Sequence, residues 1–189
     1  MLSALIVTHL KKEADGLESL LKSASFLETV VLTSCSEARR LLIDRDFDLI
    51  VINSPLADET GEILARHVAR NGVCQVLLLV KSEFFEAVSA ICESDGVLTI
   101  SKPINKTFFW SALSLAKATG SRLKRAQIEN AKLKQKIEDI RIIDRAKCVL
   151  ISHMSISEND AHRYIEKQAM DMRTTRREVA ESILKTYEN

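Results

Sequence analysis

The stretch DFDLIVINSPLADETG, residues 46–61, decides the fold of the first part of the chain. Within the predicted strand 48–53, residues 49–52 are apolar at successive positions rather than at alternate ones, as in a strand that is buried on both faces of a parallel sheet. Proline, aspartate and glycine follow, which are typical turn residues. The stretch therefore predicts a buried strand that ends in a turn.

Four other apolar runs are bounded by polar or turn residues in the same way: 2–7, 29–32, 75–80 and 96–101. Between the runs, apolar residues recur at helical spacing, as at Leu17, Leu20 and Leu21. Five such strand–helix units predict an α/β fold over residues 1–120, a doubly wound sheet of five parallel strands. Any site is expected at the carboxyl ends of the strands.

The composition argues against several classes of protein. No apolar run reaches the roughly 20 residues that span a bilayer, and the residues after Met1 lack the features of a signal peptide, so we expect a cytoplasmic protein. The four cysteines form no CxxC pair and the histidines lack ligand spacing, so no disulfide and no metal site is expected. We find no nucleophile with a base, no phosphate-binding glycine loop and no catalytic carboxylate pair, which argues against an enzyme and a cofactor.

Residues 1–120 resemble the receiver domain of response regulators. Gly61 lies eight residues after Asn53, which matches the family's turn after the third strand. Lys102 and Pro103 match the family's Lys-Pro after the fifth strand, which usually contains a cis peptide bond. The resemblance implies a receiver-like fold whose characteristic site lies around Asn53 and Lys102.

The same comparison shows that the phosphorylation site is degenerate. Where receivers have an acidic pair that holds Mg²⁺, this chain has Thr8 and His9, although a hard cation prefers carboxylate oxygens. The phosphoryl-accepting aspartate is Asn53, whose neutral amide cannot form an acyl phosphate. Val80 and Thr99 stand at the two switch positions. We therefore expect a pseudo-receiver that is not phosphorylated.

Two interpretations of the degenerate site stay open. Asn53 is either an ordinary loop residue that satisfies neighbouring backbone groups, or part of an altered site for a ligand or a regulatory protein. Lys102 either pairs with an acidic neighbour or belongs to that altered site. Either way, the domain keeps a surface that is able to dimerise or to bind a regulator.

Charge divides the chain in two. Residues 1–120 carry 12 Lys and Arg against 15 Asp and Glu, a balance of −3, whereas residues 121–189 carry 15 against 11, a balance of +4. The second part is thus suited to a polyanion. Gly120 stands at the change in composition, as a continuing helical residue or as a kink.

A short coiled-coil seam is predicted over residues 121–142. The spacing alternates between three and four residues, and a position-a asparagine of this kind selects a parallel two-stranded register. The seam residues are Leu123, Ala126, Asn130, Leu133, Ile137 and Ile140. We expect a homodimer; the alternative is that the stripe packs on its own receiver or on the following helices.

Residues 143–189 carry the most specific signal. DRAKCVL, SENDA, AMD, RT and VA occur in this order between Asp144 and Ala180, and the segment resembles the ANTAR domain, an RNA-binding antitermination module. Cys148 and His162 depart from the family's usual glycine and aromatic residue. Ser157 with Asp160, and Thr175 with Glu178, predict helix caps, which divide the segment into the end of a long helix and helices over 158–172 and 176–187.

The resemblance implies RNA-binding residues in this segment. Arginine and lysine suit phosphate, planar side chains suit unpaired bases, and small residues permit a close approach or serve as packing residues. The candidates are Ala146, Lys147, His162, Arg163, Tyr164, Arg173, Thr174 and Arg177.

The function implied by the resemblance is RNA-binding transcription antitermination. ANTAR modules recognise paired stem-loops in the leader of a nascent mRNA, and a dimer gains avidity for two hairpins. Because the phosphoryl-accepting residue is absent, assembly is expected to be constitutive or under the control of another molecule. The alternatives are a dimeric DNA-binding response regulator and a protein-interaction adaptor.

Overall fold

The computed structural model describes residues 2–72 and 74–187. The first part of the chain contains five strands and four helices: β1 (Leu2–Val7), α1 (Lys11–Ser23), β2 (Phe26–Leu32), α2 (Cys35–Asp44), β3 (Leu49–Asn53), α3 (Glu62–Asn71), β4 (Gln75–Lys81), the 3₁₀ turn η1 (Ser82–Phe84), α4 (Phe85–Glu93) and β5 (Leu98–Lys102). A long helix follows, α5 (Lys106–Met154), and then α6 (Glu158–Asp171) and α7 (Arg176–Tyr187).

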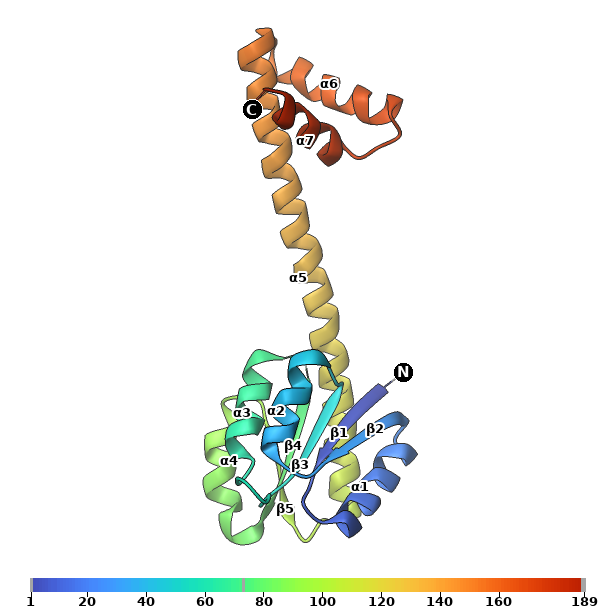
Figure 1. The fold of residues 1–189 in the computed structure, drawn as a ribbon, viewed down its shortest axis with the longest axis vertical. Helices are drawn as coiled ribbons and strands as arrows, with labels where there is room; N and C mark the ends of the chain where they lie inside the picture. Colours follow the sequence, from blue (N-terminus) through green and yellow to red (C-terminus); the bar gives the residue numbers. More distant parts are fainter. Residues whose placement is uncertain (1, 73, 188–189) are drawn as a thin grey trace. The chain divides into compact units, whose positions relative to one another are not determined.

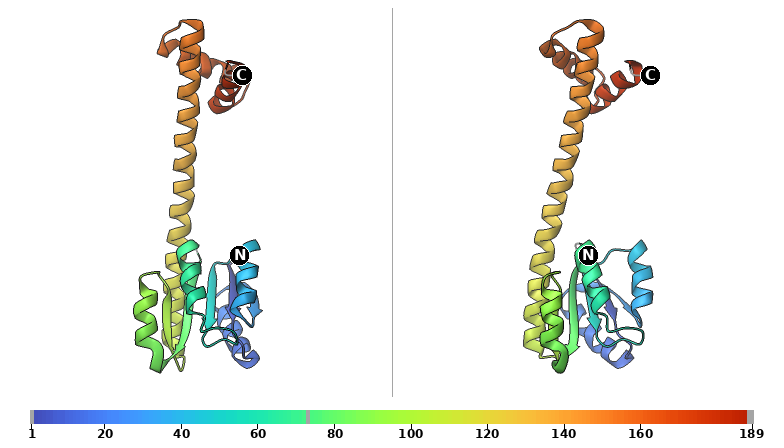
Figure 2. Two further views of the ribbon diagram at one scale, coloured as in Figure 1. Left: turned by 60° about the vertical axis from the view of Figure 1, so that its left-hand side comes forward. Right: turned by 90° about the vertical axis from the view of Figure 1, so that its left-hand side faces the viewer.

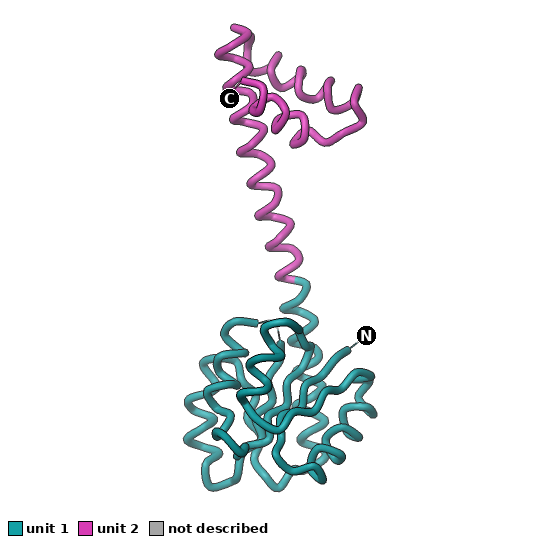
Figure 3. The backbone as a smooth tube through the Cα atoms, viewed as in Figure 1, with its two compact units in different colours: residues 1–125 teal, residues 126–189 magenta. Residues whose placement is uncertain are grey.

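The chain forms two compact units, residues 1–125 and 126–189 (Figure 3). The boundary falls within α5, which therefore contributes its first turns to one unit and its last turns to the other. The finer division into a linker over 121–142 and a module over 143–189 stays a prediction. Among the described residues no helix combines the length and the apolar character needed to cross a bilayer.

The first unit confirms the predicted fold. All neighbouring strands are parallel, and their order is β2-β1-β3-β4-β5 (Figure 1). Every residue of β3 is buried, which is why residues 49–52 are apolar in succession rather than at alternate positions. The strands lie within a residue or a few residues of the predicted runs.

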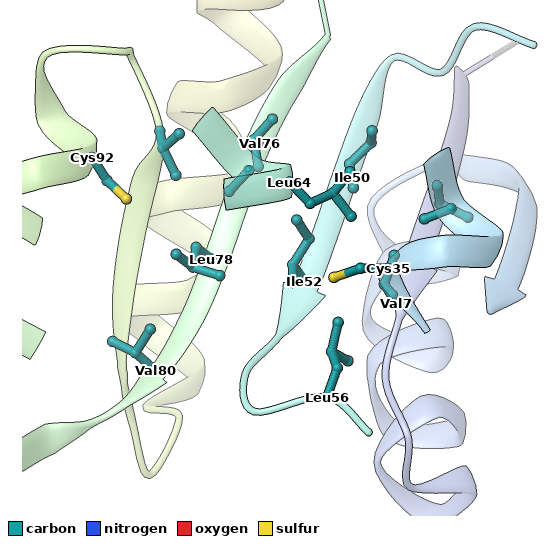
Figure 4. Close-up of a cluster of buried hydrophobic side chains, with 14 of the residues drawn as sticks. Val7, Cys35, Ile50, Ile52, Leu56, Leu64, Val76, Leu78, Val80 and Cys92 are labelled. Atoms are coloured by element: carbon teal, nitrogen blue, oxygen red, sulfur yellow. The ribbon is translucent and has the colours of Figure 1, made fainter. Parts of the chain in front are cut away.

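Two apolar layers cover the sheet. On one face, α2, α3 and α4 pack on side chains such as Ile50, Ile52 and Leu78 (Figure 4). On the other face, α1 and the first turns of α5 bury Leu17, Phe109 and their neighbours. Cys35 and Cys92 belong to the first layer and are fully buried. Burial raises the pKa of the Cys35 thiol to about 12, which makes it an inert packing group.

Two glycines are needed for close approach. Gly61 begins α3 with a φ of 80°, and a Cβ there would lie 2.6 Å from Cγ2 of Ile52. Gly120 lies inside an unbroken α5, where a Cβ would lie 3.2 Å from Cγ of Gln75. Of the two interpretations of Gly120, the structure therefore shows a continuing helix, with the glycine placed where β4 approaches it.

The second unit is a small three-helix module built by the last turns of α5 together with α6 and α7 (Figure 2). Its fully or nearly buried side chains are Ala146, Leu150, Ala161, Ile165, Ala169, Val179, Ala180 and Ile183. Both predicted caps are present: the Ser157 hydroxyl accepts from the Asp160 N–H, and Thr175 and Glu178 each accept the other's backbone N–H.

Two apolar side chains of the second unit are less buried than their helical spacing suggests. Met172 is 66% exposed because α6 ends at Asp171 and the chain turns away. Tyr187 is 41% exposed and its ring contacts the ring of His153, with the centroids 5.0 Å apart.

Candidate nucleic-acid interface and degenerate phosphorylation site

Asn53 lies at the carboxyl end of β3, where its side chain is saturated with hydrogen bonds. Its Nδ2 donates to Oγ1 of Thr8 over 3.0 Å and to the carboxylate of Glu13. Its Oδ1 accepts from Nζ of Lys102 over 2.8 Å. With 3% of the residue exposed, little capacity is left for another molecule. This geometry favours the interpretation of Asn53 as a structural residue.

Lys102 connects two backbone segments of this site. Besides Asn53, its ammonium donates to the carbonyl oxygen of Ser54, and the Lys102–Pro103 peptide is cis, as the resemblance implied. Burial lowers the pKa of Lys102; Lys81 adds to that effect and Glu13 opposes it. The ammonium is thus held by an amide and a carbonyl oxygen rather than by the phosphorylated aspartate of an active receiver.

Glu13 is the residue of this site that the sequence interpretation missed. It lies in the first turn of α1 and reaches the Asn53 amide from there. The available signal was an acidic side chain at the start of the helix that follows β1, at the carboxyl edge of the sheet where a site is expected. Thr8 is buried beside it, whereas His9 is exposed and takes no part in the network.

The two switch positions have different surroundings. Val80 is 3% exposed and packs in the apolar layer beneath α4. Oγ1 of Thr99 is buried and has no hydrogen-bond partner among residues 2–72 and 74–187. Within the same described ranges, no group of three or more histidine, cysteine or acidic side chains is arranged to hold a metal ion.

In the second unit, two of the predicted RNA-binding cations are braces between helices. Nζ of Lys147 lies 2.7 Å from Asp144 and 3.2 Å from Glu158, and these acceptors raise the pKa of the ammonium. The Lys147 side chain is only 15% exposed. These contacts fasten the start of α6 to α5.

Arg177 is the second brace. Its guanidinium lies 2.7 Å from Asp139 and 2.8 Å from Glu181, so it joins α7 to α5. Hydrogen bonds from Arg177 and, to a lesser extent, from Gln135 lower the pKa of the Asp139 carboxyl. Because Arg177 already forms two ion pairs, it would have to break them in order to bind phosphate, and that cost makes it a poor phosphate ligand.

Two other predicted cations are differently placed. Arg163 on α6 and Arg173 after its end are exposed, and neither forms an ion pair or a side-chain hydrogen bond within the described chain. Arg173 has a φ of 53°, which turns the backbone between α6 and α7. Tyr164, 38% exposed, lies next to Arg163 in sequence.

The remaining candidates also differ in whether their side chains are paired, exposed or buried. His162 lies 3.3 Å from Glu166, and Thr174 is partly exposed, with its backbone N–H bonded to the carbonyl of Ala169. Ala146 is completely buried in the core of the unit. Of the two roles considered for small residues, close approach of RNA or packing, Ala146 therefore fits packing, because none of its atoms reaches the surface.

The helix face that carries Arg163 extends further than the sequence interpretation proposed. Lys167 and Met170 follow at positions i+4 and i+7, and both are exposed, Met170 by 79%. Lys167 has no ionic partner among the described residues. The signal was available in the 3.6-residue period of α6, whose buried positions Ala161, Ile165 and Ala169 fix the opposite face.

The predicted seam residues of α5 do not pack into an apolar cluster among residues 2–72 and 74–187. Leu123, Leu133, Ile137 and Ile140 are between 43% and 58% exposed, and none belongs to an apolar cluster of either unit. Asn130 bonds only to the carbonyl of Ala126, at 3.4 Å. The alternative of packing on the chain's own helices is thus not seen, while dimerisation stays a prediction.

The comparisons with known proteins are consistent with the two compact units of the chain. The ANTAR domain family matches residues 124–184. Transcriptional regulatory protein PdtaR of Mycobacterium tuberculosis is 25% identical over 139 residues, which cover 74% of this chain and 68% of the relative.

Solved structures match the first unit in fold. A two component transcriptional regulator AraC from Clostridium phytofermentans is 19% identical, with a TM-score of 0.59 over 66% of this chain and 98% of that one. A signal receiver domain of an HD domain-containing protein from Pseudomonas fluorescens is 20% identical, with a TM-score of 0.57 over 66% of this chain and 92% of that one. The chain therefore combines a first unit that has the fold of receiver domains with a C-terminal segment that belongs to the ANTAR domain family.

Proposed function

We propose that this protein is an RNA-binding transcription antitermination factor that binds paired stem-loops in mRNA leaders as a dimer. The observation that carries the proposal is the exposed face of α6, where Arg163 and Lys167 have no ionic partner in the part of the chain that the structure describes, and Arg173 follows the end of the helix. Unpaired, exposed cations are available to phosphate at no cost in broken ion pairs.

Contacts for bases are offered by Met170 on this face and by Tyr164, which lies about 100° around the helix from Arg163. Tyr164 supplies a half-exposed aromatic ring, and Met170 an exposed, polarizable apolar side chain. Recognition of RNA loops depends on unstacked bases that pack on such groups, while the cations hold the backbone. We therefore place Arg163, Tyr164, Lys167, Met170 and Arg173 at the centre of the interface, and Lys147 and Arg177 in its support.

The decisive test is binding of the full-length protein to an RNA with two short stem-loops, beside a duplex DNA of equal length at matched salt. Arg163→Ala and Arg173→Ala are expected to weaken RNA binding, whereas Arg40→Ala is the matched control, because Arg40 is an exposed arginine of α2 without a side-chain partner among the described residues. Equal affinity for duplex DNA would favour the DNA-binding alternative. RNA affinity that is absent in the wild type and in every variant would favour the adaptor.

Dimerisation is proposed to occur through the seam of α5. Ile137 is 53% exposed at a seam position, and Ile128 is 52% exposed at a position off the seam. Ile137→Asp is therefore expected to give monomers in light scattering, while Ile128→Asp leaves the dimer intact. A monomeric wild type, or equal effects of the two variants, would contradict dimerisation through the seam.

The pseudo-receiver is proposed to work without phosphorylation. Restoring the acceptor with Asn53→Asp is expected to give no incorporation from a small phosphodonor and Mg²⁺, because Thr8 and His9 supply no second carboxylate beside Glu13. The new carboxylate also faces Glu13, which disfavours the charged pair. Stable labelling of this variant would show that the site still holds Mg²⁺, and assembly would then be expected to respond to phosphate.

A further inference from the structure

A cavity of about 290 Å³ opens in the first unit between the β3–α3 loop, the end of β4 and α4. It adjoins the Asn53 network without being part of it: Ser54 lines the cavity, and the carbonyl oxygen of the same residue accepts the Lys102 bond. Its volume is near the lower end of small-molecule sites, which measure roughly 300–1,000 Å³. A single ring or a short branched chain fits such a space.

The lining is mostly apolar. The apolar residues that line the cavity are Pro55, Leu78, Val80, Phe84, Ala87 and Val88. Figure 4 shows Leu78 and Val80 side by side along β4. Phe84 is 55% exposed, so an aromatic ring stands at this cavity with much of its surface still in water. An apolar ligand body would cover surface that the protein alone leaves wet.

One acidic group of the lining has unused acceptor capacity. The Glu62 side chain is 24% exposed, and its only ion-pair partner within the described chain is Nη1 of Arg66, 3.8 Å away. Nε of Arg66 is engaged more closely, with Asp95 at 2.7 Å. A carboxylate beside an apolar cavity is stabilised by a cationic donor, which forms a charge-assisted hydrogen bond.

The basic group of the lining is less available for an anion. Nζ of Lys81 lies 3.8 Å from Glu83, and its side chain is 58% exposed to solvent. A ligand carboxylate near Lys81 would therefore meet a neighbouring acid and a well-hydrated ammonium. The charges of the site thus favour a cationic ligand over an anionic one.

We propose that this cavity binds a compact apolar molecule with a protonated primary amine. The apolar body packs on Leu78, Val80 and the Phe84 ring, and the ammonium bonds to the carboxylate of Glu62. This site borders the degenerate phosphorylation site, with which it shares Ser54 and Val80, and it does not depend on RNA binding. It gives the first unit a means of sensing a small molecule.

The test is a methyl-detected NMR titration of the full-length protein with phenethylamine. Phenethyl alcohol and 3-phenylpropionate are matched neutral and acidic probes of similar shape. We expect saturable shifts of the Leu78, Val80 and Val88 methyl signals, with phenethylamine binding at least about fivefold more tightly than the alcohol, and the acid more weakly than both. Absence of saturable shifts, or tighter binding of the acid, would overturn the proposal.

Variants distinguish binding in the cavity from adventitious binding elsewhere on the surface. Ala87→Phe fills the cavity and is expected to abolish the shifts, while Ala90→Phe adds the same ring to an exposed position of α4 outside the lining and is expected to leave them. Ala87→Leu is a smaller filler for use if the phenylalanine lowers thermal stability. Glu62→Gln should make the amine and the alcohol bind equally. Unchanged amine preference in Glu62→Gln, or unchanged binding in both filled variants, would refute the site.

Discussion

The cationic side chains of the two units differ in burial and in pairing. At the Asn53 site, Lys102 is partly buried and bonded to two oxygen atoms, and the amide that it holds is itself saturated. On α6, Arg163 and Lys167 are exposed and have no ionic partner among the described residues. A saturated polar group contributes to stability, whereas an unsaturated exposed one is available for binding. The comparison therefore predicts that substitutions in the first region change folding and those in the second change RNA affinity.

The largest effect is expected for Lys102→Met. The change leaves Oδ1 of Asn53 and the Ser54 carbonyl without their donor, and each unsatisfied buried group costs about 1–3 kcal/mol. Because the change also removes the cost of partly burying the Lys102 ammonium, we expect a net loss of about 2 kcal/mol in the free energy of unfolding. Urea denaturation followed by the fluorescence of Trp110, which lies in the first unit, measures it. RNA affinity of the folded variant should stay within about twofold of the wild type.

The double variant Arg163→Ala with Arg173→Ala should show the reverse pattern. Two lost phosphate contacts at about 1 kcal/mol each lower RNA affinity about 30-fold, while unfolding changes by less than about 0.5 kcal/mol. Filter binding over a range of salt concentrations is the measurement. The slope of log affinity against log salt should fall by about 0.7 for each contact to a single-stranded phosphate. An unchanged slope would remove these arginines from the interface.

A sharper version of the comparison uses two lysines of the second unit. Lys147→Ala breaks a brace between α5 and α6 and should lower stability by about 0.5–1 kcal/mol, since its acidic partners are themselves exposed. Lys167→Ala should leave stability unchanged and weaken RNA binding severalfold. Thermal unfolding by circular dichroism and RNA titration on the same samples distinguish the two. A larger loss of RNA affinity in Lys147→Ala, at equal stability, would restore Lys147 to the interface.

The smallest expected effect is a loss of folding stability at acidic pH. In the first unit, hydrogen bonds from Arg39 lower the pKa of Glu59, and those from Arg70 and Arg66 lower the pKa of Asp95. A lowered folded-state pKa stabilises the fold above the unfolded value and loses that contribution as pH falls through the folded value. The ordinary pKa values of the unfolded chain are 4.5 for Glu and 3.8 for Asp. Stability of this unit should therefore begin to fall below about pH 4.5.

The second unit offers the contrast for that measurement. Asp139 is the acidic group described there whose pKa is clearly lowered, whereas the first unit has several. The Trp110 fluorescence transition in urea should accordingly shift more between pH 6 and pH 3.5 than the helical signal that remains from α6 and α7. A larger acid shift of the helical signal would contradict this ranking.

The fold was predictable because its determinants are local and repeated. Five apolar runs, of which those forming β1, β3 and β4 are largely buried, specify parallel strands, and Gly61 marks a turn that an added Cβ would block. The caps of α6 and α7 were equally readable, since a capping residue acts on a backbone N–H only three positions away. Topology then brings the strand ends, and with them Thr8, Asn53 and Lys102, to one edge.

The candidate sites were only partly predictable because pairing between distant residues is not visible in a sequence. Glu13 reaches Asn53 from another element, and Arg177 meets Asp139 across the second unit. A cation looks the same in sequence whether it is paired or exposed, so Lys147 and Arg163 could not be told apart. Ala146 shows the same limit for small residues, since only packing decides whether such a side chain faces a ligand or a core.

The hydrogen bonds around Asn53 also bear on its chemical ageing. Spontaneous deamidation of asparagine begins when the backbone nitrogen of the next residue attacks the side-chain carbonyl carbon, and an aspartate results. Here the Ser54 nitrogen donates to the carbonyl of Leu79 over 2.9 Å, and the Asn53 amide is held at both ends. Neither group is free to rotate into the attacking geometry. The hydrogen-bond network around Asn53 therefore also protects the amide, over the lifetime of the molecule, from conversion into a carboxylic acid.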